Sequence, residues 1–286
     1  MKTIEMAAPP GSASMYLRAL RTSGKSPDAV MALPEITYVR PRVVLEAEHI
    51  GRYAALCGFA AVHGVPPTYP QLLTFPLVMQ FIGSSDCPWP AMGTVHLANA
   101  IEQRDCLRQG DAVRVEMSTG RLFAHEKGQV FTLELRILRD GQLVWQGTQT
   151  LLRVGVEQPT GEPYASRLVS ALPLSRQADI SVPGNLGRRY GTVSGDMNPI
   201  HLSALSARLF GFRRAIAHGL WTKARALASL LPAGPVGQAA VAVEFKTPLL
   251  LPARASLWTT RSAGRAWFEV RDANGQRPHL RGELSY

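Results

Sequence analysis

The most informative stretch of the sequence reads Tyr190-Gly191-Thr192-Val193-Ser194-Gly195-Asp196-Met197-Asn198-Pro199-Ile200-His201. Three side chains that can move protons or orient water, Asp196, Asn198 and His201, lie close together in it. A purely structural interpretation is available, because Asn caps helices and Pro is favoured at the first helical position, so Asn198 would cap a helix that begins at Pro199. On these residues alone, the structural and the catalytic interpretations are equally good.

A second stretch, Ala217-His218-Gly219, favours catalysis. A helix that begins at Gly219 would expose backbone N–H donors at its positive end, where a negatively charged oxygen can be held. Addition of water to a double bond conjugated with a thioester needs a base, an acid and a donor to the enolate oxygen. Asp196, His201 and the Gly219 amide could supply these three.

An internal repeat acts as a control for this hypothesis. Arg52–Gly58 matches Arg189–Gly195, each with Arg-Tyr at its start and Gly at its end. Counted from the shared Gly, the first copy has Phe59, Ala61 and Gly64 where the second has its three polar residues, and Pro76 is expected at the position of Gly219. Proline has no N–H to donate. The first half is therefore predicted to be catalytically silent, and the second half to carry the site.

Both halves also share an order of predicted elements. Long apolar helices are expected over Tyr69–Gly83 and Ala217–Leu231, and alternating strands over Val113–Met117 and Ala255–Thr259. Asp140-Gly141 and Asn274-Gly275 are typical of hairpins with type I′ turns, which need positive φ angles. The predicted class is α+β, with one helix against one curled antiparallel sheet in each half.

The repeat and the loop composition predict the domain ranges. Residues 1–30 form a loosely held arm around a short helix at Ser14–Arg21, residues 31–154 the N-terminal domain and residues 173–286 the C-terminal domain. Residues 155–172 are rich in Pro, Gly and Ser without periodicity and are predicted to be a linker, with the boundary near Ala171.

Composition excludes several classes of protein. The chain is 46% hydrophobic and has no apolar run of the roughly 20 residues that a spanning helix needs, so no membrane association is expected. Pro9, Pro10 and Gly11 interrupt any signal-peptide core, which predicts a cytoplasmic protein. The net charge of +10 comes mostly from scattered Arg, without the clusters typical of a nucleic-acid groove. The three cysteines lack CxxC spacing and are expected to be reduced structural thiols.

The residues of the second half resemble the MaoC-like family of (R)-specific enoyl-CoA hydratases and 3-hydroxyacyl-thioester dehydratases. The resemblance rests on the Tyr, the Ser-Gly-Asp-x-Asn-Pro-x-His core and the Ala-His-Gly that follows. It extends over Phe210-Gly211-Phe212 and Phe245-Lys246-x-Pro248-x-x-x-Pro252, while Thr68-Tyr69-Pro70 and Thr74-Phe75-Pro76 look like the degenerate half of double-hotdog members.

This resemblance implies a double hotdog, two hotdog units in one chain that form a pseudo-dimer. It further implies that Asp196 and His201 hold the water, Asn198 orients it and the Gly219 amide binds the thioester oxygen. The substrate would be an acyl thioester of coenzyme A or acyl carrier protein, with no other cofactor and no metal. How Asp196 and His201 divide the two proton transfers stays open, as do chain length, carrier, pathway, net direction and a further homodimer.

Other residues are predicted to contribute to substrate binding. Tyr190 and Ser194 are expected to support the site, and His218 is more typical of a hydrogen-bonded structural group than of a third catalyst. Arg213 and Arg214 suit phosphate or an acidic carrier, although a solvated loop is an equally good interpretation. In the silent half, Phe75 and Met79 are predicted either to pack in the core or to contact a long acyl chain.

Two alternative functions remain at this stage. A hotdog thioesterase would use a carboxylate to activate water for attack on the carbonyl, and a non-catalytic acyl-thioester-binding protein would keep the fold without needing both proton-transfer groups. The Asp-x-Asn-x-x-His pattern favours the hydratase.

Overall fold

The computed structural model describes residues 2–166, 168, 170 and 172–286. The chain forms two compact units, and each is assembled from several segments. The first unit contains residues 2–45, 70–101 and 110–166; the second contains residues 46–69, 102–109 and the described residues from 168 to 286. Among the described residues, none of the helices is both long and apolar enough to cross a membrane.

The first unit is built on an antiparallel sheet with two short added parallel strands, β1 and β7. Its strands lie in the order β1-β2-β4-β5-β6-β3, and β7 pairs with β4. Their bounds are β1 Lys2–Glu5, β2 Ile36–Val44, β3 Thr94–Gln103, β4 Ala112–His125, β5 Gly128–Arg139, β6 Gln142–Val154 and β7 Glu162–Pro163. Only β1 with β2 and β7 with β4 are parallel among the described pairings within this unit.

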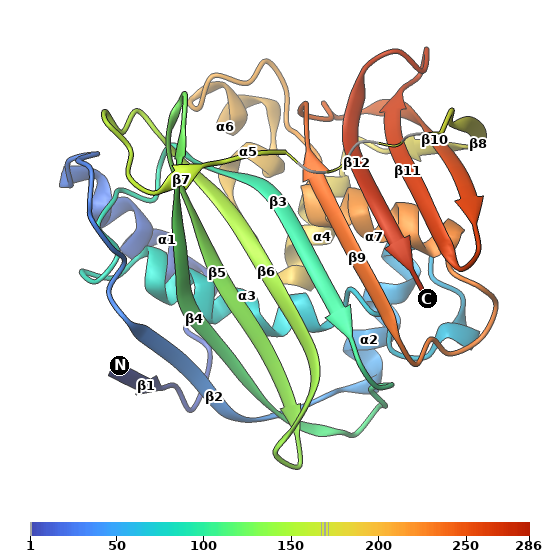
Figure 1. Cartoon of the computed structure of the whole chain (residues 1–286), viewed down its shortest axis with the longest axis horizontal. Helices are drawn as coiled ribbons and strands as arrows, with labels where there is room; N and C mark the ends of the chain where they lie inside the picture. Colours follow the sequence, from blue (N-terminus) through green and yellow to red (C-terminus); the bar gives the residue numbers. More distant parts are fainter. Residues whose placement is uncertain (1, 167, 169, 171) are drawn as a thin grey trace. The chain divides into compact units, whose positions relative to one another are not determined.

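Three helical segments belong to this unit, α1 (Ser12–Arg21), η1 (Thr22–Gly24) and α3 (Pro70–Ile82). Helix α3 lies along one side of the sheet and contacts β2, β4 and β5 (Figure 1). Leu77 and Phe81 on α3 are fully buried, as are Val115 and Met117 on β4, because alternate residues of a strand point to the same face. The expected pairing of a long helix with a curled antiparallel sheet is therefore confirmed in this unit.

The second unit repeats this plan. Its strands β8 (Ser175–Val182), β9 (Ala239–Phe245), β10 (Ala253–Ser262), β11 (Arg265–Asp272) and β12 (Pro278–Ser285) lie in the order β9-β12-β11-β10-β8 and pair antiparallel. Helix α7 (Gly219–Leu230) contacts β11 and β12, and lies across this sheet in Figure 1. Leu227 and Leu230 of α7 and Phe268 of β11 are buried in the core of the unit.

The shorter helices of the second unit come from both halves of the sequence. They are α2 (Ala47–Cys57), η2 (Ala61–His63), α4 (Leu186–Ser194), α5 (Pro199–Leu202) and α6 (Ala204–Arg208). Helix α2 contacts α4 and α7, and the Trp221 indole N–H donates to the Leu56 carbonyl at 3.1 Å. Residues 46–69 thus complete the unit that holds the second copy of the repeat. The domain ranges drawn in chain order stay predictions, and Ala171, the expected boundary, lies outside the described residues.

Two local expectations need correction. Pro76 was matched to Gly219, but it lies inside α3, and the residue that begins α3 is Pro70. Pro70 also lacks an N–H, so the first residue of α3 cannot donate as Gly219 can. The turn between β5 and β6 has positive φ at Asp140 and Gly141, as a type I′ turn requires. Between β11 and β12 only Gly275 has positive φ, because the Asp272 carboxylate accepts the Gln276 and Arg277 N–H groups and forms a longer loop.

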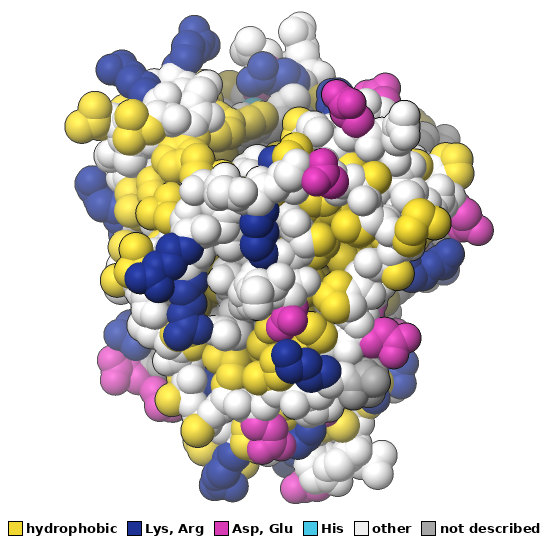
Figure 2. Space-filling view, turned by 90° about the vertical axis from the view of Figure 1, so that its left-hand side faces the viewer, with side chains coloured by type: hydrophobic (Ala, Val, Ile, Leu, Met, Phe, Trp, Pro, Cys, Tyr) yellow, Lys and Arg dark blue, Asp and Glu magenta, His cyan; other side chains and the backbone are white. Residues whose placement is uncertain are grey.

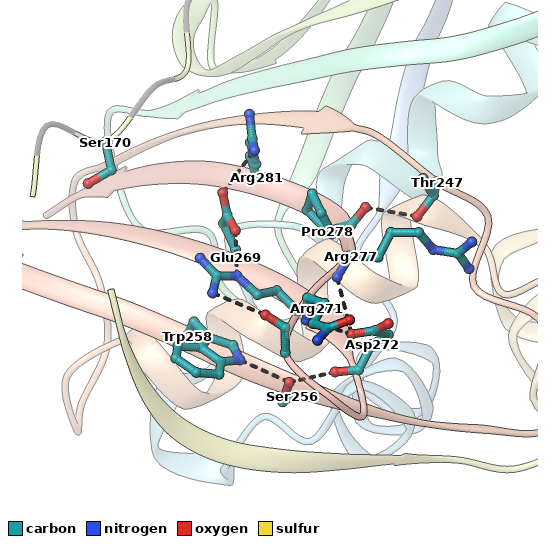
Figure 3. Close-up of polar contacts among 12 residues, drawn as sticks. Ser170, Thr247, Ser256, Trp258, Glu269, Arg271, Asp272, Arg277, Pro278 and Arg281 are labelled. Carbon is teal, nitrogen blue, oxygen red and sulfur yellow. Dashed lines mark hydrogen bonds and ion pairs between the residues drawn. The ribbon is translucent and has the colours of Figure 1, made fainter. Parts of the chain in front are cut away.

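Charged side chains form a cross-strand network on the second sheet (Figure 3). Glu269 accepts a hydrogen bond from the Arg271 Nε–H at 2.6 Å and forms an ion pair with Arg281, whose Nε lies 2.7 Å from Glu269 Oε1. The Arg271 guanidinium lies 4.6 Å from the centre of the Trp258 ring. Figure 2 shows, on one face of the molecule, Lys and Arg side chains interspersed with hydrophobic and acidic ones. On the visible face, the basic residues are scattered rather than gathered in one groove.

The three cysteines are free thiols, and Cys57 and Cys87 are buried. Burial raises the pKa of the Cys57 thiol to about 12, which leaves it protonated at neutral pH. A thiol in this state is a poor nucleophile.

Candidate active site

The end of helix α4 shapes the turn that carries Asp196. Gly195 adopts a left-handed conformation with φ of 80°, and its N–H donates to the Gly191 carbonyl at 2.9 Å. This conformation is accessible to Gly at little cost, so the chain reverses there. The Asp196 N–H then donates to Ser194 Oγ, and Asp196 Oδ1 accepts the Asn198 N–H, both at 3.2 Å. Ser194 therefore supports the turn, and the Asp196 side chain is 27% exposed.

Asn198 is the N-cap of helix α5. Its Oδ1 accepts the Ile200 N–H at 3.3 Å. Pro199 begins the helix, and the N–H that proline lacks would have no acceptor within the helix at that position. The structural interpretation of Asn198 is thus confirmed, and it leaves the side-chain amide N–H2 outside the cap.

His201 is held by the carbonyl of Ile216. The His201 side chain is almost fully buried, its Nδ1 lies 2.8 Å from the Ile216 oxygen, and the Ile216 N–H donates to the Ile200 carbonyl at 3.0 Å. Because a carbonyl only accepts, Nδ1 carries the proton and Nε2 of the neutral ring has a free lone pair. Burial lowers the pKa of His201 against the opposing effects of Asp196 and the Ile216 carbonyl, so the ring is neutral at neutral pH.

His218 completes the cluster. Its Nε2 donates to the Asp196 carbonyl at 3.0 Å and lies 3.7 Å from Asp196 Oδ2. Its ring stacks on that of His201 with centroids 3.6 Å apart, and the centroid of the Tyr190 ring lies 4.8 Å from that of His218. Burial, followed by the neighbouring His201, lowers the pKa of His218 to about 3. The ring is therefore a neutral hydrogen-bonded support, as the sequence favoured.

The structure thus brings Asp196, His201 and His218 together. One atom of each side chain that could ligate a metal lies within 4.8 Å of the other two. Such a set has the composition of a metal site. However, the two imidazole rings are stacked with only 27° between their planes. Because Nδ1 of His201 and Nε2 of His218 are both bonded to backbone carbonyls, one nitrogen of each ring remains for another partner.

Gly219 is the first residue of α7, so its N–H has no acceptor within the helix. A Cβ at this position would lie 2.6 Å from the Phe245 ring of β9, which explains why the helix begins with Gly. The Tyr190 side chain of α4 is also buried, and its ring contacts that of His218.

Two glycines of α4 that were not predicted to belong to the site hold it close to the helix. A Cβ on Gly187 would lie 1.8 Å from the His201 carbonyl oxygen, and a Cβ on Gly191 would lie 2.8 Å from the Asp196 carbonyl oxygen. The two glycines are four residues apart, on one face of α4. The four-residue spacing of these two glycines was the signal that the sequence offered.

The first copy of the repeat has an apolar filling at the equivalent turn. The Phe59 ring packs against the rings of Tyr53 and His63, with centroids 6.4 and 5.9 Å apart. His63 is buried, and its two ring nitrogens lie 3.2 and 3.1 Å from backbone carbonyl oxygens, of which a neutral ring can donate to one. Both nitrogens therefore face the backbone, which agrees with a silent copy.

The remaining predicted residues lie elsewhere. Arg213 and Arg214 are exposed in the loop between α6 and Ile216. Phe75 and Met79 are half-buried on one face of α3, in the first unit. Their contribution to substrate binding stays a prediction.

Comparison with known proteins identifies the family. Residues 172–280 match the MaoC like domain. The 3-hydroxyacyl-thioester dehydratase X of Mycobacterium tuberculosis is 33% identical over 249 residues, which cover 87% of this chain and 88% of that protein. The chain belongs to the MaoC-like dehydratase family. The resemblance recognised in the sequence is thereby confirmed for this MaoC-like protein.

Solved structures agree with this assignment. A crystal structure of HtdX from Mycobacterium tuberculosis superposes with a TM-score of 0.73 at 30% identity, and covers 87% of this chain and 98% of that one. Another protein of the same organism, described as a double hotdog, superposes with a TM-score of 0.56 at 12% identity over 86% of this chain and 93% of that one. The second likeness concerns the fold alone. This chain has the double-hotdog fold.

Proposed function

We propose that this MaoC-like protein catalyses the reversible dehydration of (R)-3-hydroxyacyl thioesters to trans-2-enoyl thioesters carried by coenzyme A or acyl carrier protein. The observation that carries the proposal is the contact cluster of Asp196, His201 and His218, in which His201 is buried, neutral and fixed in one tautomer. The name of the Mycobacterium tuberculosis relative, which is a 3-hydroxyacyl-thioester dehydratase, supports the substrate class.

The chemistry needs two proton transfers. In dehydration, one group removes a proton from C2 of the acyl chain, and the C3 hydroxyl accepts a proton and leaves as water. The neutral His201 ring has an acceptor lone pair at Nε2, and Asp196 is the second titratable group of the cluster. The transfers run in reverse when water adds to the enoyl thioester. Asp196 and His201 are proposed to share these transfers.

Two further residues complete the proposed mechanism. The Gly219 N–H donates to the thioester oxygen, where negative charge develops as the C2 proton leaves, and the positive end of α7 adds to this stabilisation. Asn198 holds the water or hydroxyl with its amide N–H2, since its Oδ1 is already engaged in capping α5. No metal or redox cofactor takes part in these steps.

The substrate-binding residues follow the same proposal. Tyr190, Ser194 and His218 keep the cluster in place, and Arg213 and Arg214 meet the phosphates of the carrier group because guanidinium pairs well with phosphate. Phe75 and Met79 are proposed to contact the acyl chain.

The test is the incubation of the full chain with crotonyl-CoA, followed by enoyl absorbance and by titration of free thiol. We expect loss of absorbance without free thiol, and dehydration of (R)- but not (S)-3-hydroxybutyryl-CoA. Release of thiol would establish a thioesterase instead. If a series of acyl-chain lengths on both carriers gave neither signal, the protein would be a binding protein and the proposal would be wrong.

A further inference from the structure

The most exposed apolar side chains of the second unit lie on helix α6 and on the residue that caps its C-terminal end. Leu205 is 76% exposed and Leu209 is 80% exposed, while the other large apolar residues described as exposed in this unit are at most 52% exposed. The two leucines are four residues apart, so they share one side of the helix, with Arg208 beside them. Two neighbouring leucines left in water are typical of a surface that contacts another molecule.

Helix α6 belongs to a loop that is tied to the catalytic histidine. We call residues 202–215 the α6 loop. Two hydrogen bonds between the residues that flank this loop hold its ends together. The Ile216 N–H donates to the Ile200 carbonyl, and His201 Nδ1 donates to the Ile216 carbonyl. Inside the loop, the Phe212 N–H donates to the Ala207 carbonyl at 3.1 Å, which returns the chain to α6. A molecule bound to this loop therefore contacts a segment whose ends are bonded to the backbone of Ile200 and, through the Ile216 carbonyl, to the side chain of His201.

The charge of the loop is uniformly positive. Arg208, Arg213 and Arg214 are exposed, and in the part of the chain that the structure describes none of them forms an ion pair. The sequence has no Asp or Glu between Asp196 and Glu244. An acidic partner would therefore meet no repulsion along this segment.

We propose that Leu205, Leu209, Arg208, Arg213 and Arg214 form the docking surface for an acidic acyl carrier protein that delivers the thioester. This inference rests on the proposed function. Coenzyme A alone would need only cations for its phosphates, and it would leave the two leucines in water. A carrier protein with acidic and apolar residues on one helix face covers both the leucines and the arginines.

The experiment separates docking from chemistry. Binding of a bacterial acyl carrier protein with its phosphopantetheine arm is measured by anisotropy for the wild type, for the double variant Leu205→Gln/Leu209→Gln and for the control Val62→Gln, whose side chain is 52% exposed in the same unit. In parallel, KM is measured for one (R)-3-hydroxyacyl group on this carrier protein and on coenzyme A.

We expect the double variant to weaken carrier binding and to raise KM for the carrier substrate by about tenfold, as the loss of one buried apolar contact pair does at interfaces. KM for the coenzyme A substrate should stay within about twofold, and the control should match the wild type. Arg208→Gln should reduce the salt dependence of carrier binding.

Other outcomes overturn the proposal. If the wild type fails to bind the carrier protein, or the double variant binds it as well as the wild type, the docking surface is wrong even when both substrates are turned over. A wild-type dimer that dissociates in the double variant, seen by light scattering, would assign the surface to a second copy of the chain. Lack of turnover with intact carrier binding would refute the proposed function and leave the docking surface standing.

Discussion

Replacement of Gly187 by Ala is the sharpest test of how the cluster is positioned. The added Cβ would lie 1.8 Å from the His201 carbonyl oxygen, whereas real Cβ contacts are essentially never under 3.0 Å. The His201 backbone must therefore move away from α4 by about 1.2 Å, the difference between these distances. A displacement of roughly 1 Å at a reacting group lowers turnover by about 100-fold, because the geometry of attack is lost. We expect a loss of this size in kcat for hydration of crotonyl-CoA.

Two variants provide a graded control. A Cβ on Gly191 would lie 2.8 Å from the Asp196 carbonyl oxygen, so Gly191→Ala should cost only a few-fold, roughly, in kcat. A Cβ on Gly184 would have its nearest contact at 3.7 Å, an ordinary van der Waals distance, so Gly184→Ala should behave as the wild type. Far-UV circular dichroism and Tm report whether each variant is folded. A folded Gly187→Ala protein with wild-type kcat would refute the positioning role of α4.

Three further predictions concern α7 and its start. His218→Phe keeps an aromatic ring beside His201 but removes the donor to the Asp196 carbonyl. The value of kcat should therefore fall by about tenfold. An unchanged kcat with a lower Tm would make His218 purely structural. Gly219→Ala should displace the start of α7 from Phe245, and the added Phe245→Leu should restore part of the activity; no recovery in the double variant would contradict this cause. Lys223 is fully buried, and burial lowers its pKa from 10.5 to about 7. Between pH 7 and pH 10.5 the unfolded chain keeps a proton on Lys223 that the folded chain has lost. The free energy of unfolding should therefore rise by about 2 kcal/mol from pH 7 to pH 9. Denaturant unfolding at both pH values should show this rise in the wild type and not in Lys223→Met.

The sequence was sufficient to predict several of the local elements that carry Asp196, Asn198 and His201, because these elements depend on local patterns. The cap at Asn198, the helix start at Gly219 and the type I′ turn at Asp140-Gly141 follow from the conformations that these residues prefer. The pairing of a long helix with an antiparallel sheet follows from apolar periodicity in the same way.

Long-range packing was beyond the sequence. Nothing local indicates that α2 contacts α4 and α7, because this depends on how an apolar helix face finds its partner. Pro76 was matched to Gly219 for a related reason. The starts of the two long helices were aligned before their bounds were known, and α3 in fact begins at Pro70. The close approach of Gly187 to His201 likewise appears only once both backbones are in place.

Asp196 and His201 are the two groups proposed to carry the proton transfers. Asp196→Asn keeps an oxygen that can accept the Asn198 N–H and removes only the charge and basicity of the side chain. The most direct measurement is kcat/KM for crotonyl-CoA hydration by Asp196→Asn and His201→Ala, with Tm as a control for folding. Each variant should lose activity by about two orders of magnitude or more while it stays folded. Near-wild-type activity in either folded variant would contradict it.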